Sequence, residues 1–433
     1  MEEPEAGGTG RRVAETVALW RDWVPPGSPQ RRTAVAVALG VGLYLLRRPS
    51  AISSASLWAE DGTIFLSQSL ERGWRAVNDS YAGYLHISPR LLAMVASWLP
   101  FRWTPVVYAL GSAVITVACC SLVLSRRSSW LLPTWVSRIA VFVGLICLPR
   151  VAELHATLTN VIWWCGIGLL LTILLDDPST TVGKVSEAAA VALLVLSGAN
   201  GVVLAPFVVF RWWRTRSIHS LVIAAVWWAA AGIQGWVLIH AERSLDGGDL
   251  PWPVTLVRWS VERTLGPFVL SGPYVDRPAN LLAGFPLAAQ VLIVIAGLIA
   301  AVVLIGGHRP STSILLVGVA AASCLAGFMS LGPAAPLLPE RYTAIPAAAL
   351  LIGLISARPS RRIIAASKCV LLVWIVVARP LDFPITPRPV LKWGPGADCV
   401  ERRIEDRCVI PLNPPVDPGV APWQVVVDSD VAR

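Results

Sequence analysis

The sequence predicts an all-α polytopic membrane protein with about 11 transmembrane helices. Of its 433 residues, 55% are hydrophobic and 15% are charged, and the mean hydropathy is +0.63, whereas a soluble domain carries about 45–50% apolar and about 25% charged residues. Twenty tryptophans suit a chain with many water–lipid interfaces. These values exclude a soluble enzyme and a disordered tail. The net charge of +9 fits the charge that orients membrane segments, so no nucleic-acid partner is expected.

Apolar runs recur along the chain, and a single span needs roughly 20 residues. The runs lie at 33–46, 104–125, 137–149, 160–175, 185–198, 201–213, 219–240, 284–306, 311–331, 343–357 and 362–378. The runs 185–198 and 201–213 are short and separated by glycines. We expect them to be two short helices that meet in a turn lined by protein, since irregular backbone is not tolerated against lipid.

Arginines in short loops predict the orientation of the chain. Loops assigned to the inside are rich in arginine, and loops assigned to the outside carry one each at Arg150 and Arg341. We therefore expect a multi-pass protein of the bacterial plasma membrane. Its expected parts are a cytoplasmic segment 1–32, a transmembrane domain 33–378 with outside loops at 49–103 and 241–283, and a short extracytoplasmic C-terminal segment 379–433. Arg47 and Arg48 lie on the outer side against this pattern, and we expect them to snorkel to the interface.

The first outside loop contains two adjacent carboxylates, Glu60 and Asp61. A carboxylate that is shielded from water has a raised pKa and can act as a general base. It can also bind a metal ion, so a divalent cation is compatible with the site, although no cofactor is certain and no metal-ligand spacing is present. An acid followed by glycine and an apolar run also fits the start of an ordinary helix. Residues 90–99 are expected to form a juxtamembrane helix at the outer interface.

Further polar residues are expected on the same side of the membrane. Arg90 has the geometry to bind a phosphate with two nitrogens, and the neighbouring residues can contact substrate, but aromatic belts and snorkelling arginines have the same composition. Polar groups at helix ends often build membrane sites. The candidate substrate- or donor-binding residues are Tyr81, His86, Arg90, Glu153, His155, Asn160, Arg258, Arg263, Arg341 and Tyr342.

Some of these candidates have ordinary alternatives. Arg258 is spaced to pair with Glu262 on a surface helix, and Arg341 can simply form a salt bridge near an interface tyrosine. Six of the eight cysteines lie in apolar runs and are expected to be small core residues. Cys399 and Cys408, with eight residues between them, can form a disulfide if the tail lies outside the cytosol.

The order of these parts resembles the GT-C superfamily of integral-membrane glycosyltransferases, which use sugars linked to polyprenyl phosphate. The resemblance is carried by Ala-Glu-Asp-Gly at 59–62, Gly-Tyr-Leu-His-x-x-Pro-Arg-Leu at 83–91 and Arg-Tyr at 341–342, and it covers roughly residues 30–378. It extends to uncharacterised bacterial members. It is architectural, and no single motif is diagnostic.

The resemblance implies an inverting hexosyl- or pentosyltransferase with a GT-C-like fold that acts in cell-wall glycan biosynthesis. Asp61, or Glu60, would remove a proton from the hydroxyl of a cell-envelope glycan or glycolipid acceptor. Arg341 and Tyr342 would lie near the polyprenyl-phosphate sugar donor in the lipid bilayer. Arg341, Arg90 or an arginine of 241–283 would stabilise the departing phosphate.

Three other functions remain open from the sequence. A lipid-linked oligosaccharide flippase or another transporter would need charged groups along the middle of its spans, which the runs largely lack. A polymerase or ligase of the O-antigen type would share the outside arginines but use a diphosphate-linked donor. A non-catalytic scaffold would use the acidic pair only as a helix cap.

Overall fold

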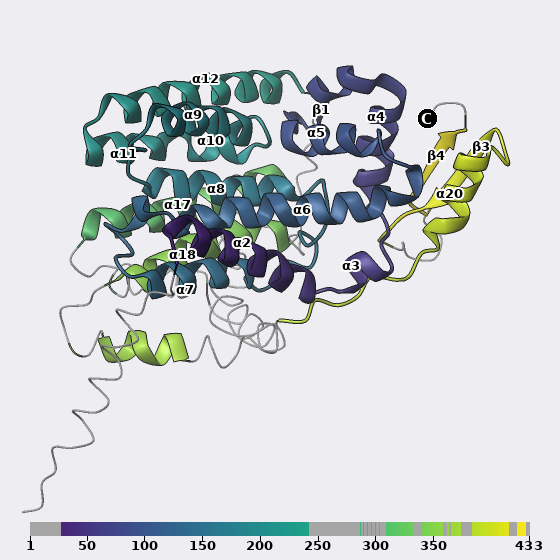
Figure 1. Cartoon of the computed structure of the whole chain (residues 1–433). Helices are drawn as coiled ribbons and strands as arrows, with labels where there is room; N and C mark the ends of the chain where they lie inside the picture. Colours follow the sequence, from purple (N-terminus) through teal and green to yellow (C-terminus); the bar gives the residue numbers. More distant parts are fainter. Residues whose placement is uncertain are drawn as a thin grey trace, which may run out of the picture.

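The computed structural model describes residues 27–241, 309–331, 340–357, 365–373, 383–414 and 422–429, with isolated positions at 362 and between 286 and 303. Most of the described residues are helical, and their strands form two short antiparallel pairs. The helices lie side by side, and the yellow C-terminal segment is at one end of them (Figure 1). Arg258, Arg263 and most of the run 284–306 lie outside the described residues.

The predicted apolar runs that fall within the described residues are helical. The principal helices are α2 (Pro29–Leu46), α6 (Thr104–Ser121), α7 (Trp135–Ile146), α8 (Val161–Leu174), α9 (Thr181–Val195), α10 (Asn200–Leu204), α11 (Val208–Thr215), α12 (Ile218–His240), α17 (Pro310–Leu331) and α18 (Ala344–Ser356). Short 3₁₀ segments join or extend them at η4 (Leu122–Leu124), η5 (Arg126–Ser128), η6 (Ala205–Phe207) and η9 (Glu340–Thr343).

Three helical stretches are long and apolar enough to cross a membrane, judged by length and composition. They are Phe101–Leu124, Ile218–His240 and Pro310–Gly327. The other apolar helices in the described part of the chain are shorter. A mostly helical fold with three candidate membrane-spanning helices in its described part is therefore confirmed, whereas the total of about 11 spans stays a prediction.

Helix α8 forms the centre of the core. All 14 of its residues are buried, as expected for a helix that is apolar on every side. It packs against α6, α9, α10 and α18. Helix α2 begins four residues before the predicted run because Ser28 accepts a hydrogen bond from the backbone N–H of Arg31 at 3.3 Å and Pro29 occupies the first turn.

The two short runs meet in a turn, as the sequence predicts, but the second is not one helix: it divides into α10, η6 and α11 around Pro206. Between α9 and α10 the chain turns within the protein, and a Cβ on Gly201 would lie 2.9 Å from the backbone of Val195. The indole N–H of Trp227 donates to the carbonyl of Gly201 at 2.8 Å. At the other end of α9, buried Glu187 pairs with Arg211, Nη2 to Oε2, at 2.9 Å, which ties α9 to α11.

The first outside loop folds into short elements at one end of the bundle. They are α3 (Ser50–Ser53), the π-helical η1 (Asp61–Leu66), α4 (Ser67–Arg72), η2 (Gly73–Asn78), β1 (Ser80–Tyr81), β2 (Tyr84–Leu85), α5 (Ile87–Ala96) and η3 (Phe101–Trp103). Strands β1 and β2 form a hairpin. Helix α5 has ten residues and is too short to be a span, in keeping with a juxtamembrane helix.

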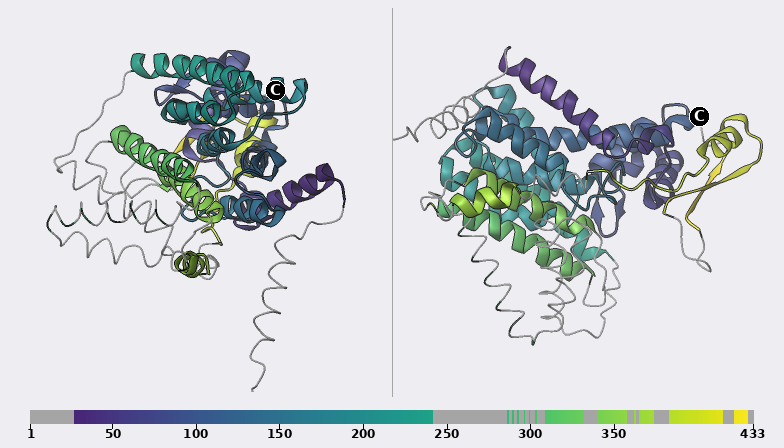
Figure 2. Two further views of the ribbon diagram at one scale, coloured as in Figure 1. Left: turned by 90° about the vertical axis from the view of Figure 1, so that its left-hand side faces the viewer. Right: turned by 90° about the horizontal axis from the view of Figure 1, so that it is seen from below.

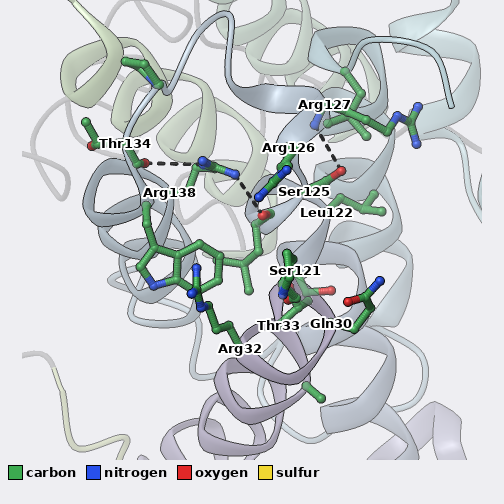
Figure 3. A pocket seen from close by; sticks show the side chains of 16 residues that line it. Gln30, Arg32, Thr33, Ser121, Leu122, Ser125, Arg126, Arg127, Thr134 and Arg138 are labelled. Carbon is green, nitrogen blue, oxygen red and sulfur yellow. Dashed lines mark hydrogen bonds between the residues drawn. The ribbon is translucent and has the colours of Figure 1, made fainter. Parts of the chain in front are cut away.

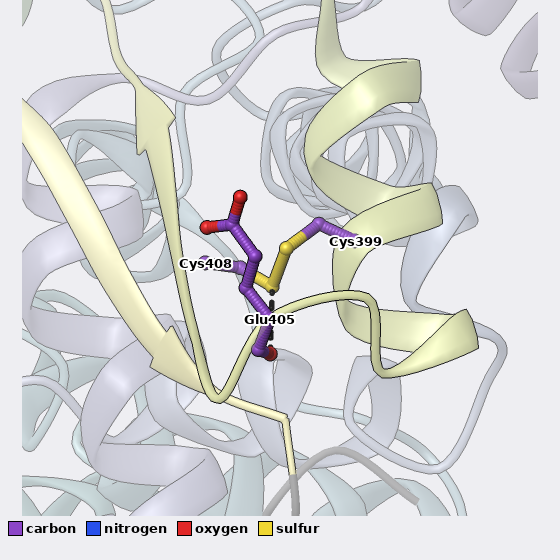
Figure 4. Close-up of a disulfide and its surroundings, with 3 residues drawn as sticks. All are labelled: Cys399, Glu405 and Cys408. Atoms are coloured by element: carbon purple, nitrogen blue, oxygen red, sulfur yellow. Dashed lines mark hydrogen bonds between the residues drawn. A yellow bond between two sulfur atoms is a disulfide. The ribbon is translucent and has the colours of Figure 1, made fainter.

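The C-terminal segment consists of α20 (Trp393–Arg402), β3 (Arg407–Pro411) and β4 (Gln424–Asp428), with β3 antiparallel to β4. A disulfide between Cys399 and Cys408 joins α20 to β3 (Figure 4), and the two Cα atoms are 5.9 Å apart. Seen from below, this segment projects from the end of the bundle that carries the first outside loop (Figure 2).

The C-terminal segment packs onto the first outside loop. Buried Leu412 lies against Gly62, where a Cβ would come within 2.6 Å of the leucine side chain. The backbone N–H of Asn413 donates to the carbonyl of Leu57 at 3.0 Å. Because apolar residues of both parts share one buried cluster, the tail acts as a cap on the loop that contains the acidic pair.

Candidate active site

Asp61 joins the predicted first outside loop, residues 49–103, to the predicted second outside loop, residues 150–159. Its carboxylate is 1% exposed and accepts the backbone N–H groups of Leu158 at 3.1 Å and Thr159 at 2.8 Å. Burial raises the pKa of Asp61 to about 7, although both amides and the positive charge of Arg388 favour the ionised form. Both carboxylate oxygens are therefore already occupied by the protein.

Glu60, in contrast, keeps an oxygen available. It is half-buried, and its Oε2 is buried with no hydrogen-bond partner among the described residues. Burial, the charge of Glu60 and a side-chain hydrogen bond to Glu60 raise the pKa of Tyr81 to about 12, while the charge of Arg341 acts in the opposite direction. Tyr81 is thus within electrostatic range of both Glu60 and Arg341. Since a buried acceptor without a partner is costly, Glu60 is suited to receive a hydrogen bond from a ligand.

Arg341 lies at the same place, held by the second outside loop. It forms an ion pair with Glu153. The side-chain amide of Asn160 donates to the carbonyl of Glu153 at 3.1 Å and fixes that loop. The guanidinium lies 5.6 Å from the centre of the Tyr342 ring. The predicted residues Glu60, Tyr81, Glu153, Asn160, Arg341 and Tyr342 are therefore brought together from three distant segments.

An apolar pocket of about 430 Å³ adjoins this polar cluster. Tyr84, Tyr342 and residues of α8, α10, α12 and α17 line it, and the polar residues among them also include Asn200, Ser323 and Ser330. Trp163 packs edge-on against Tyr342, with ring centres 4.8 Å apart. The Tyr342 hydroxyl and the Ser330 hydroxyl share a hydrogen bond of 3.2 Å. A mostly apolar pocket with a few polar groups is typical of a small-molecule site.

Three predicted site residues lie in the interior instead of on the pocket surface. His86 stacks on Tyr84 with 4.5 Å between ring centres, and burial lowers its pKa to about 3, so it is neutral. Arg90 is 2% exposed and lies 5.3 Å from the centre of the Phe65 ring. His155 stacks on a buried tyrosine of α2, and burial together with nearby arginines lowers its pKa.

The tail contributes a residue that sequence reasoning missed. Arg388 lies 4.8 Å from the centre of the Trp58 ring, and its Nη2 donates to the carbonyl of His155 at 2.9 Å. Its charge acts on Asp61. No sequence pattern marks Arg388, because its proximity to Asp61 depends on how the tail docks.

The snorkelling interpretation of Arg47 and Arg48 is wrong. Both side chains are buried, at 1% and 4% exposure. Arg47 donates from Nη1 to the carbonyl of Ile146 at 2.7 Å, and Arg48 donates from Nη2 to the carbonyl of Ala152 at 3.0 Å. Each also donates to a carbonyl of the C-terminal segment. These arginines fasten the outside loops and the tail to the end of α2.

In the part of the chain that the structure describes, no three His, Cys, Asp or Glu side chains lie close enough to hold a metal ion together.

Comparison with protein-family models, curated proteins and solved structures found no match to this chain. Its functional assignment therefore rests on the geometry described above.

Proposed function

We propose that this protein is an inverting membrane glycosyltransferase that moves a sugar from a polyprenyl-phosphate donor to a hydroxyl of a cell-envelope glycan or lipid. The observation that carries the proposal is the unpartnered Oε2 of Glu60, whose carboxylate acts on Tyr81 together with Arg341, while Tyr342, the neighbour of Arg341, lines an apolar pocket. A general base, a cation and an apolar channel are the three groups that such a transfer requires.

The base in this proposal is Glu60. Asp61 is 1% exposed, and each of its oxygens accepts a backbone N–H, from Leu158 and from Thr159, so the fold holds its carboxylate away from the surface at which a substrate would bind. Asp61 is therefore a positioning residue that fixes the start of η1 against the second loop. Its raised pKa follows from burial.

The reaction balances as a single displacement. Glu60 accepts the proton of the acceptor hydroxyl while that oxygen bonds to the anomeric carbon. The bond from the anomeric carbon to the phosphate oxygen breaks, and its electron pair stays on the polyprenyl phosphate. Arg341 stabilises the charge that develops on this leaving group. The Glu153 carboxylate holds Arg341 at the site before the donor binds.

The pocket between α10, α12 and α17 is proposed to take the first isoprenoid units of the donor. The phosphate would lie where Tyr342, a lining residue of the pocket, adjoins Arg341. In this arrangement the site and the disulfide-bonded tail face the outside of the cell, where disulfides persist. The N-terminal end of α2 then faces the cytoplasm.

The test uses the full chain purified in lipid and a panel of polyprenyl-phosphate sugars with candidate acceptor glycans. Release of polyprenyl phosphate is measured for wild type, Glu60→Gln, and Glu71→Gln as a control at an exposed position. Loss of a general base lowers the rate by about 10²–10⁴-fold, so Glu60→Gln should lose release at unchanged protein abundance. The Glu71→Gln control should release polyprenyl phosphate at the wild-type rate.

Release of polyprenyl phosphate by Glu60→Gln at the wild-type rate would exclude this mechanism. Asp61→Asn should lose less of the polyprenyl-phosphate release than Glu60→Gln does, and its melting temperature should change. Release only from diphosphate-linked donors would favour a polymerase or ligase. Movement of labelled lipid-linked sugar across the bilayer without any release would favour a flippase.

A further inference from the structure

A second hollow of about 830 Å³ lies at the opposite end of α2, among α2, η4, η5 and α7 (Figure 3). Helix α2 has 18 residues, which at 1.5 Å per residue gives about 27 Å. Its first turn borders this hollow, whereas Arg47, just beyond its last residue, donates to the carbonyl of Ile146 at the far end of α7. The hollow is therefore separate from the candidate active site.

Arginine dominates the wall of this hollow. Arg32, Arg126 and Arg138 surround the same space, while the Arg127 side chain turns away to pair with Glu187 (Figure 3). None of the described residues that line the hollow is acidic. Like charges so close together repel one another unless a counter-charge lies between them. The charge of the wall therefore favours binding of an anion.

The hydrogen bonds of these arginines are incomplete. The Nε of Arg32 is buried and has no hydrogen-bond partner among the described residues. Arg138 is 9% exposed; among the described residues its hydrogen bonds go to the carbonyls of Thr134 and Leu124, both at the long distance of 3.4 Å, and its guanidinium lies 5.8 Å from the centre of the Trp135 ring. Arg126 is exposed at the rim. Guanidinium groups with free donors are the preferred partners of phosphate oxygens.

An apolar groove of about 650 Å³ continues from this hollow between α2 and α7. The two share Arg32 and Trp135, and the rest of the groove wall is chiefly Val, Leu, Ile and Phe side chains. Leu39 is 68% exposed in it. At Gly40 a Cβ would lie 2.6 Å from the Phe142 ring, so the glycine lets the two helices approach and form the floor of the groove.

We propose that these adjoining hollows bind one anionic phospholipid. Its phosphate lies among Arg32, Arg126 and Arg138, and one acyl chain lies along the α2–α7 groove past Leu39. Basic pockets between membrane helices are known to take acidic lipid headgroups. A free phosphate would satisfy the arginines but leave the groove empty, whereas an uncharged lipid would fill the groove and leave the arginines uncompensated.

The test is native mass spectrometry of the full purified chain, titrated with phosphatidylglycerol, with phosphatidylcholine of the same chains, and with glycerol 3-phosphate. Losing one charge-assisted hydrogen bond weakens binding by about tenfold or more. Arg126→Gln with Arg138→Gln should therefore weaken phosphatidylglycerol binding at least about tenfold. Leu39→Trp should weaken it by obstructing the groove, and Arg75→Gln, an exposed control near the other end, should leave it unchanged.

The single variant Arg126→Gln keeps the test valid if the double variant misfolds, because this arginine is exposed at the rim. It should weaken binding with an unaltered melting temperature. Equal binding of phosphatidylcholine and phosphatidylglycerol, or full binding by Arg126→Gln, would overturn the headgroup site. Glycerol 3-phosphate binding as tight as that of phosphatidylglycerol, or full binding by Leu39→Trp, would overturn the assignment to a lipid.

Discussion

Asp61 makes the stability of the folded protein depend on pH. The pKa of its buried carboxyl is about 7, against 3.8 for an ordinary aspartate. Between these values the folded state holds a proton that the unfolded state has released. The folded state therefore loses stability as the pH rises through this window, and the loss ends once the pH passes the folded-state pKa.

The size of the effect follows from the same shift. In the middle of the window each pH unit changes the free energy of unfolding by about 1.4 kcal/mol, and the slope falls as the pH nears 7, so a rise from about pH 5 to about pH 7 lowers it by about 2–3 kcal/mol. An unfolding entropy of about 2.1 cal/mol/K per residue gives about 0.9 kcal/mol/K for 433 residues. The melting temperature should therefore fall by about 2–3 °C across that range.

Replacing Asp61 by asparagine removes the titrating group. The Asp61→Asn variant should melt lower at the acidic end, because the amide nitrogen of asparagine cannot accept the second backbone N–H. Its melting temperature should then fall with pH by about 2–3 °C less than that of the wild type. Tryptophan fluorescence during thermal unfolding measures this, with Glu71→Gln as the control. Melting temperatures that fall equally with pH in the wild type and in Asp61→Asn would contradict the role of Asp61 in this pH dependence.

Other predictions concern the docking of the tail. Gly62→Ala should lower the free energy of unfolding by about 1–3 kcal/mol through overpacking, measured by chemical denaturation, and Leu412→Ala in the same chain should restore part of it. Cys399→Ser should expose the C-terminal segment to limited proteolysis at unchanged helicity; equal digestion would contradict a stabilising disulfide. Arg388→Gln should raise the pH at which the Asp61-dependent loss of melting temperature ends, because a positive charge near Asp61 is removed.

Composition and periodicity predict most of the helical elements. The apolar runs at 104–125 and 219–240 need no tertiary information to be helices, because uniformly apolar segments in lipid must satisfy their own backbone groups. The glycines near 198–201 likewise predict a break between two short helices. The first turn of α2 was missed, since the cap at Ser28 precedes the apolar run.

The acidic pair is visible in the sequence, but the difference between its two members is not. Glu60 and Asp61 are neighbours, yet Oε2 of Glu60 has no hydrogen-bond partner among the described residues, whereas both oxygens of Asp61 accept backbone N–H groups. That difference depends on residues 158–159, almost 100 positions away, and on the direction in which a π-helical turn points each side chain. Neither the long-range contact nor the direction of the side chains can be inferred from a local sequence pattern.

Composition and local pattern are enough to predict that this protein is helical and apolar, that an acidic pair and Arg341 are chemically suited to one site, and that Cys399 and Cys408 can pair if the tail lies outside the cytosol. Which charges meet depends on the tertiary structure. It buried Arg47 and Arg48 under the outside loops, brought Arg388 near Asp61, and left Arg32, Arg126 and Arg138 around an uncompensated hollow. The physical reason is that burial and partner choice are set by long-range packing, whereas the sequence directly encodes only local propensity and apolar pattern.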